Sequence, residues 1–214
     1  MFSDTARHCR ALKNGLSVTD IPLSEKGIQQ ALNWRRAFEH ISFDRICSSD
    51  LIRSHETAQR ICPDREIELF PQLREINLGE WEGLAMSEVR ARFPEAWAAR
   101  GGDMSGYRPP RGESFADLSQ RVLPVFENIA LNSQEKNILI VSHAGVNRVI
   151  LCHILGMPLA RLFSIDQEYG ALNIIHCEEN LWKVSGMNLQ LQSEIDNSLK
   201  LMDSCLRSNA AERK

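Results

Sequence analysis

The feature that most constrains the fold is a continuous apolar run, Ile138–Val141, which passes directly into a helix-forming stretch that begins near Ala144. An uninterrupted aliphatic run is typical of a parallel strand that is buried on both faces. His143 stands at the junction, and open α/β sheets bind their ligands at the carboxyl ends of strands. The pattern therefore predicts an α/β fold with His143 in a ligand site.

The first half of the chain shows the same alternation of helices and strands. Ser24 can cap a helix whose apolar residues, ending at Phe38, fall near one face. The β-like Asp44–Ser48 follows, then a helix from about Leu51 to Ile61. Ile67–Phe70 is short, apolar and bounded by polar residues, which predicts another strand.

The alternation breaks between residues 84 and 111. Short helical pieces around Pro94 and the turn-rich loop Gly101–Tyr107 predict a small helical insertion over an edge of the sheet. Ser114 then opens a long amphipathic helix, and Asp117 can complete its capping box.

The C-terminal part predicts a hairpin and a final helix. Ala171–His176 and Leu181–Val184 are the two strands of the hairpin. Residues 191–214 space their apolar side chains as an amphipathic helix that ends in a frayed tail; this helix packs on its own domain or forms a homodimer contact. We expect residues 1–190 to form one three-layer α/β domain, a mostly parallel sheet with helices on both faces and the small insertion.

The composition argues against several classes of function. The 214 residues carry a net charge of −3, so nucleic acid and anionic membrane are poor partners. Six cysteines lie scattered without a C-x-x-C pair, which suggests neither a zinc site nor a secreted disulfide framework. No apolar run approaches the ~20 residues that span a bilayer, and the N-terminus lacks a signal-peptide core. We expect a cytoplasmic protein with no metal, no cofactor and a small-molecule partner.

A second histidine lies beside an arginine at the other end of the chain, in Arg7-His8, and Arg53 supplies a further guanidinium. A neutral imidazole can attack phosphorus, and two arginines would hold the phosphoryl oxygens and discourage protonation of that imidazole. His143 and the helix amides at Ala144-Gly145 would add donors, so charge could be spread without a metal ion. These residues predict one phosphate site with His8 as the nucleophile.

Phosphomonoester cleavage also needs a general acid, because an alkoxide leaves slowly at neutral pH. Glu75 is the best candidate, and after a phosphohistidine forms it could take a proton from water. The residues alone do not choose Glu75 over Glu80, Glu82 or Glu113.

Taken in order, these blocks resemble the histidine phosphatase superfamily, the phosphoglycerate-mutase-like enzymes. The blocks that match this family are V-S-H-A-G, L-R-E-x-x-L-G-x-W-E-G, D-x-P-L-S-x-x-G and the Arg-His pair, with an asparagine six positions after its histidine. The resemblance implies phosphomonoester hydrolysis through a phosphohistidine. The implied catalytic residues are His8, Glu75 and His143, and the implied substrate-binding residues are Arg7, Asn14, Arg53 and Ala144.

The phosphatase branch is favoured over the mutases because of the Glu75 block and because the chain lacks room for the mutases' longer insertions. Within this branch, Gly112–Phe115 and Leu155–Pro158 are most similar to the α-ribazole-5′-phosphate phosphatases of cobalamin assembly. Broad-specificity phosphatases share much of this pattern, so they are the alternative.

Three departures from the family pattern are Cys9, which replaces a glycine beside the nucleophile, Arg10-Ala11, which replaces Glu-Thr, and a short loop from Asn14 to Asp20. The first strand, Met1–Thr5, is also weak, because it lacks the usual run of aliphatic residues. Cys9, Arg10 and the weak first strand motivate an alternative of another class, a catalytically silent protein that keeps the phosphate pocket but signals or scaffolds.

Aromatic residues in the insertion raise a question of substrate shape. Phe93, Trp97 and Tyr107 either cap the leaving-group side of the phosphate pocket, where a ring could stack on a flat substrate, or anchor the insertion to the domain. The sequence leaves both possibilities open.

Overall fold

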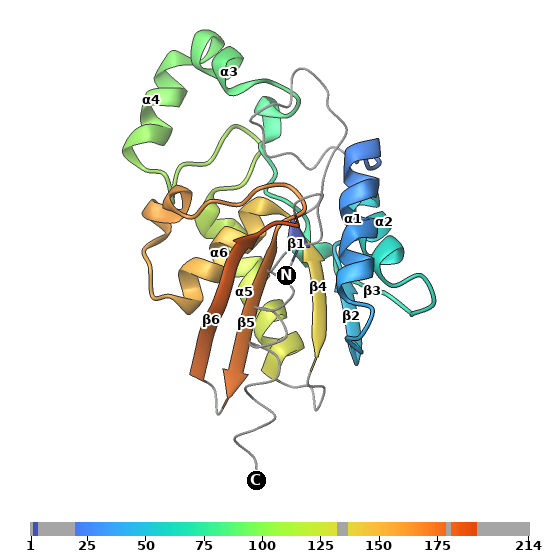
Figure 1. The fold of residues 1–214 in the computed structure, drawn as a ribbon. Helices are drawn as coiled ribbons and strands as arrows, with labels where there is room; N and C mark the ends of the chain where they lie inside the picture. The colour runs from blue at the N-terminus through green and yellow to red at the C-terminus, as the bar shows by residue number, and fades with distance from the viewer. Residues whose placement is uncertain (1, 4–19, 132–136, 179–180, 192–214) are drawn as a thin grey trace.

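The computed structural model describes residues 2–3, 20–131, 137–178 and 181–191, which form one sheet between two layers of helices (Figure 1). The strand order is β3-β2-β4-β1-β5-β6. Strands β1 to β4 pair in parallel, whereas β5 and β6 pair antiparallel and close one side, so the sheet is mixed. The strands are β1 (Phe2–Ser3), β2 (Arg45–Ser48), β3 (Glu68–Leu69), β4 (Ile138–Ser142), β5 (Leu172–Glu178) and β6 (Leu181–Leu189).

Helices cover both faces of the sheet, as the sequence predicts. Successive residues of a strand point to opposite faces. Accordingly, Leu139 and Val141 of β4 join the core beneath α1 and α2, and Ile140 joins the core beneath α5 and α6. The four helices are α1 (Glu25–Ala37), α2 (Ile52–Ile61), α5 (Phe115–Leu131) and α6 (Ala144–Ile154).

Local capping explains where two of these helices begin. The Ser24 hydroxyl accepts a hydrogen bond from the Gly27 amide at 3.1 Å, which satisfies a free donor at the start of α1. Before α5, the Asp117 amide donates to the Ser114 hydroxyl at 3.1 Å, and the Ser114 amide donates to the Asp117 carboxylate at 2.8 Å. Both predicted caps are confirmed.

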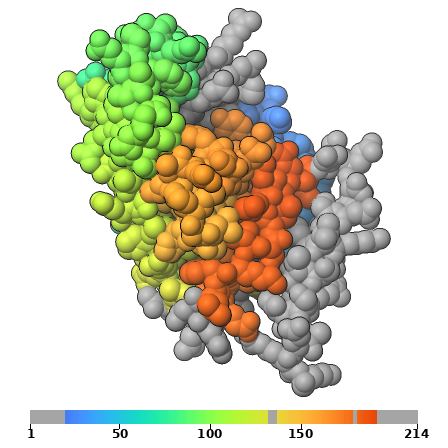
Figure 2. Space-filling model, turned by 90° about the vertical axis from the view of Figure 1, so that its left-hand side faces the viewer, coloured from blue at the N-terminus to red at the C-terminus, as the bar shows by residue number. Residues whose placement is uncertain are grey.

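The insertion consists of α3 (Met86–Arg92) and α4 (Pro94–Gly102), which rise at one end of the sheet. On the face in Figure 2 it lies above the orange segment that follows α6. Phe93, Trp97 and Tyr107 are partly buried against the α5–α6 core, and Tyr107 stacks on the buried Trp81 with ring centroids 5.6 Å apart. These contacts favour the anchoring role of the aromatic residues.

Some boundaries differ from the sequence prediction. Strand β3 is shorter than Ile67–Phe70, because the chain turns at Pro71 into a short 3₁₀ helix that ends at Leu73. The hairpin strands β5 and β6 are longer than expected. The predicted C-terminal helix falls almost entirely on residues 192–214, outside the described residues, so this helix and the homodimer contact stay predictions.

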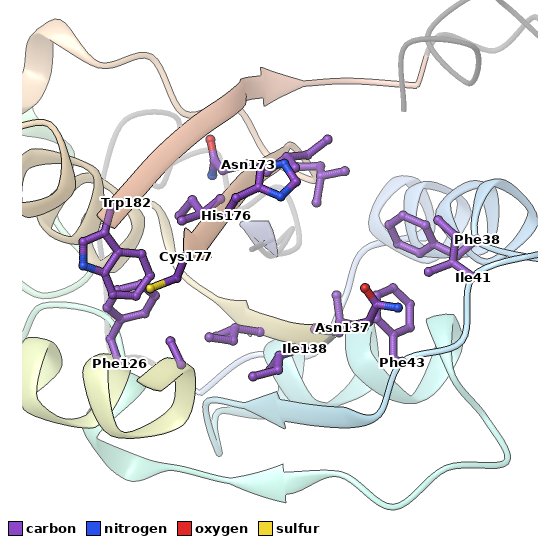
Figure 3. Close-up of a pocket in the computed structure, with 16 residues that line it drawn as sticks. Phe38, Ile41, Phe43, Phe126, Asn137, Ile138, Asn173, His176, Cys177 and Trp182 are labelled. Carbon is purple, nitrogen blue, oxygen red and sulfur yellow. The ribbon is translucent and has the colours of Figure 1, made fainter. Parts of the chain in front are cut away.

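A cavity of about 230 Å³ lies between β4 and β5 (Figure 3). Its lining is mostly apolar and includes Phe38, Phe126 and Trp182. Asn173 contributes a polar side chain that already exchanges hydrogen bonds with Gln167 at 2.8 and 2.9 Å. The cavity reaches β4 at Ile138–Ile140, away from the carboxyl end of the strand.

None of the helices formed by the described residues is both long and apolar enough to cross a membrane.

Candidate active site

The parallel register of β2 and β4 brings two side chains together at one edge of the sheet. Ser48 lies opposite Val141, so both strands end at the same level. Ser49 follows β2, and His143 follows β4 as the residue that precedes helix α6. Both are buried, and the Ser49 Oγ lies 2.9 Å from the His143 Nε2. The sequence placed His143 at a strand end but did not identify Ser49, whose only signal was its position after the predicted strand.

Arg53 lies in the first turn of α2 and is 5% exposed. Its Nη2 is 3.3 Å from the His143 Nδ1. A guanidinium only donates hydrogen bonds, so Nδ1 accepts, and the neutral imidazole carries its proton on Nε2 and donates it to Ser49. The contact fixes both the orientation and the tautomer of His143.

Glu75 is 3% exposed and lies against the start of α6. Its carboxylate accepts hydrogen bonds from the Ile76 amide at 2.9 Å and from the Gly145 amide at 3.0 Å. The expectation that the Gly145 amide would point at phosphate is therefore wrong in this structure, because that amide donates to Glu75. Ala144, the other expected amide donor, occupies the first position of α6, beside His143.

The other three candidate acids make different contacts. Glu82 accepts a hydrogen bond from the Leu78 amide at 2.8 Å, and Glu80 is an exposed residue that pairs with Arg111 at 3.4 Å. Glu113 pairs with Arg121. Among these four candidates, Glu75 accepts a hydrogen bond from the helix that follows His143.

A surface ion pair links the Glu75 loop to the end of β2. Arg74 donates to Asp50 through Nε and Nη2 at 2.7 and 2.6 Å, and these bonds hold the pKa of Asp50 below its usual range. Asp20 accepts a hydrogen bond from the Ile52 amide at 2.7 Å, where a negative charge stabilises the start of α2. Both contacts involve residues that lie just before Arg53 in the chain, Asp50 and Ile52.

Two further guanidiniums lie on the insertion side, and the sequence reasoning missed both. Arg100 of α4 and Arg148 of α6 lie 5.9 and 5.3 Å from the centre of the Phe163 ring. Burial lowers the pKa of Arg148, while the charge of Glu75 opposes this shift.

The structure brings together Arg53, Glu75, His143 and Ala144 of the predicted site. Arg7, His8 and Asn14 lie outside the described residues. Within the part of the chain that the structure describes, no group of three or more histidine, cysteine or acidic residues is arranged to hold a metal ion.

The sequence of this chain is similar to those of known proteins. The family model described as "Histidine phosphatase superfamily (branch 1)" matches residues 5–190. The adenosylcobalamin/alpha-ribazole phosphatase of Salmonella typhimurium is 32% identical over 178 residues, which cover 82% of this chain and 87% of the relative. Phosphoserine phosphatase 1 of Hydrogenobacter thermophilus is 28% identical, over 79% and 82% of the two chains.

A solved structure is also similar to this chain in its fold. The alpha-ribazole phosphatase from Shigella flexneri superposes with a TM-score of 0.79 at 25% identity, covering 92% of this chain and 98% of its own.

The ion pair of Glu113 makes a prediction about stability in acid. Burial would raise the pKa of Glu113, but hydrogen bonds from Arg121 and from the Asn77 amide outweigh burial and lower the pKa. A lowered folded-state pKa means that the carboxylate stabilises the fold above its unfolded pKa, and that this contribution is lost as pH falls through the folded pKa. The free energy of unfolding should thus fall below about pH 4.5, and Glu113→Gln should make that fall shallower.

Urea unfolding at a series of pH values measures this effect, with Glu39→Gln at an exposed position as the control. Equal acid-side slopes in the wild type and Glu113→Gln would contradict the prediction.

Proposed function

Given that the chain belongs to branch 1 of the histidine phosphatase superfamily and is a phosphatase, we propose that it hydrolyses phosphomonoesters through a phosphohistidine formed on His8. One observation carries the proposal on the structural side: a guanidinium, a carboxylate and a histidine from three separate segments meet at one sheet edge. The His143–Arg53 and Glu75–Gly145 contacts join them. Groups of these three kinds can bind phosphoryl oxygens and move a proton without a metal ion.

In the first step, an imidazole nitrogen of His8 attacks phosphorus and the bond from phosphorus to the ester oxygen breaks. Glu75 gives its proton to the departing oxygen, so the leaving group departs as a neutral alcohol. In the second step water attacks the phosphohistidine, Glu75 takes a proton from that water, and inorganic phosphate leaves. Glu75 ends the cycle protonated, as it began.

The remaining groups hold the phosphoryl oxygens. Arg7 and Arg53 carry fixed positive charge, and the planar guanidinium fork meets two oxygens at once. Asn14, His143 and the Ala144 amide add uncharged donors. When substrate binds, a phosphoryl oxygen replaces the Ser49 hydroxyl as the acceptor of the His143 Nε2 proton, while Arg53 continues to hold the ring through Nδ1.

For the substrate, we propose a small-molecule phosphomonoester, with α-ribazole 5′-phosphate as the first candidate. Its support is the 32% identity over most of both chains to a relative named for that activity. Broad specificity is the alternative, because a relative named for phosphoserine is 28% identical. Our proposal places the enzyme in the cytoplasm, in accord with Cys62 and Cys152, which are free thiols.

Replacing His8 with alanine should abolish turnover, because no phosphoenzyme can form. We expect the release of phosphate from p-nitrophenyl phosphate and from α-ribazole 5′-phosphate to fall by about three orders of magnitude or more. His40→Ala, in the exposed turn that follows α1, is the control and should keep wild-type rates. Near-normal turnover in His8→Ala would contradict the proposed nucleophile.

Replacing Gly145 with alanine should impair the acid without unfolding the protein. A Cβ atom at this position would overlap the Oε1 of Glu75, and the buried carboxylate would have to move. Alanine favours a helix over glycine, so the melting temperature should hold. We expect kcat to fall roughly tenfold to a hundredfold, since a displacement of about 1 Å can cost that much.

Gly101→Ala is the matched control, because a Cβ there meets no atom within 4 Å. Wild-type kcat in Gly145→Ala would show that the observed contact between Glu75 and the start of α6 is not needed for catalysis.

A further inference from the structure

The proposed acid lies on a segment that has neither helix nor strand. Residues 75–78 connect two short 3₁₀ helices, Pro71–Leu73 and Gly79–Trp81, without a regular backbone hydrogen-bond pattern of their own. Such segments are usually more mobile than helices or strands. A general acid must nevertheless stay within hydrogen-bond reach of the leaving oxygen. Something outside the segment therefore has to hold it.

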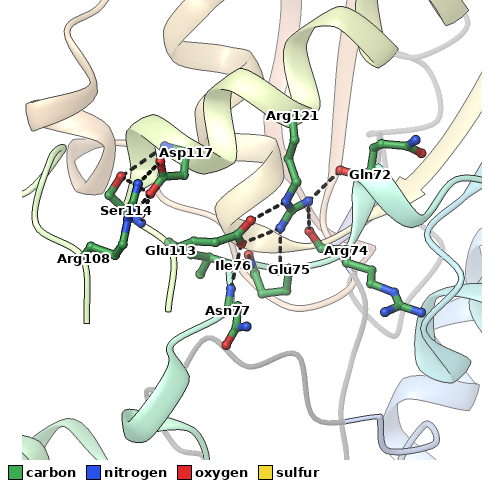
Figure 4. Close-up of polar contacts among 10 residues, drawn as sticks. All are labelled: Gln72, Arg74, Glu75, Ile76, Asn77, Arg108, Glu113, Ser114, Asp117 and Arg121. Carbon is green, nitrogen blue, oxygen red and sulfur yellow. Dashed lines mark hydrogen bonds and ion pairs between the residues drawn. The ribbon is translucent and has the colours of Figure 1, made fainter. Parts of the chain in front are cut away.

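Arg121 of α5 holds this part of the chain, and all five N–H groups of its guanidinium donate hydrogen bonds (Figure 4). Its Nη1 donates to the backbone carbonyls of Gln72 at 2.7 Å and Arg74 at 2.9 Å. Its Nη2 donates to the carbonyl of Glu75 itself at 3.0 Å. The remaining donations go to Glu113, from Nε at 2.7 Å and from Nη2 at 2.8 Å.

Glu113 holds the same segment from the other side. Its carboxylate accepts the Asn77 amide at 3.0 Å, and its own amide donates to the Asn77 carbonyl at 2.7 Å. The carboxylate also neutralises the Arg121 charge and fixes the direction of the guanidinium plane. Together, Arg121 and Glu113 bind the backbone on both sides of Glu75.

We infer that Arg121, supported by Glu113, is a positioning residue for the general acid. It does not touch the reacting atoms, because its bonds go to backbone oxygens and to Glu113. By binding the carbonyl of Glu75, Arg121 fixes the backbone from which the side chain extends. The Gly145 amide then fixes the position of the carboxylate. The inference rests on the proposed function, in which Glu75 is the acid.

The geometry also explains why arginine is needed at this position. Lysine has three donors on a single nitrogen, whereas these acceptors are distributed around a planar fork with five donors. Arg121→Lys keeps the positive charge beside Glu113 but cannot reach three carbonyls and two carboxylate oxygens at once. This variant therefore separates the effect of geometry from the effect of charge.

The test compares kcat/KM for two substrates with different leaving groups. Nitrophenol departs with little need of a proton, whereas an alkyl phosphate depends on the acid. We expect Glu75→Gln to lower kcat/KM for the alkyl ester about a hundredfold more than for p-nitrophenyl phosphate. Arg121→Lys and Glu113→Gln should show the same selectivity in weaker form, roughly tenfold, because the acid is present but displaced.

Arg108→Gln is the matched control. Arg108 makes a paired contact with Asp117 on the same helix, at 2.8 and 2.6 Å, in a cluster separate from the Glu75 segment. Its loss should leave the ratio of the two kcat/KM values unchanged. The melting temperature of each variant records any general loss of stability.

Each outcome decides between the two claims. If Glu75→Gln is selective but Arg121→Lys and Glu113→Gln lower both substrates equally, Arg121 is merely structural and the inference is overturned while the proposed acid stands. If Glu75→Gln itself shows no selectivity, the acid assignment falls, and the positioning role falls with it. Should Arg121→Lys fail to fold, the selectivity of Glu113→Gln decides alone.

Discussion

The parallel pairing of β2 with β4 is the constraint on which the site depends. It ends both strands at one level, so that Ser49 and His143 meet although 94 residues separate them in the chain. The helices that follow these strands then bring Arg53 and the first amides of α6 to the same place. A shift of the register by one residue would turn each buried strand over and separate these groups. The pairing of the strands thus fixes the relative positions of Ser49, His143 and Arg53 in the candidate site.

The proposed acid, Glu75, is the part of the candidate site that the sheet does not position. Glu75 reaches it on an irregular segment, and its buried carboxylate needs hydrogen bonds to offset the loss of water. Backbone amides of Ile76 and Gly145 supply them. The guanidinium of Arg121 restrains the backbone of the segment, so order here comes from side chains rather than from secondary structure.

Helix caps and the buried strand β4 can be predicted from the sequence, because they depend on residues close together in the chain. Contacts between residues far apart in the chain cannot. The Ser24 and Ser114 caps follow from residues three positions apart, and the apolar run before His143 identifies a buried strand. The choice of Glu75 among four carboxylates depends on Gly145, 70 residues away, and no periodicity encodes that contact. For the same reason the sequence did not assign Arg121 its three carbonyl partners. The roles of Arg7 and His8 are predicted from the residues and that of Asn14 from the family resemblance, and all three lie within the match over residues 5–190.

The most direct test of the central claim is to trap the covalent intermediate. The enzyme is mixed with a ³²P-labelled phosphomonoester, denatured within milliseconds, and divided between acid and alkali. The account predicts a labelled protein whose phosphate survives alkali, is lost in acid and maps to His8, because phosphorus bound to imidazole nitrogen hydrolyses when the ring is protonated. A label that resists acid, or one that persists in His8→Ala, would contradict it.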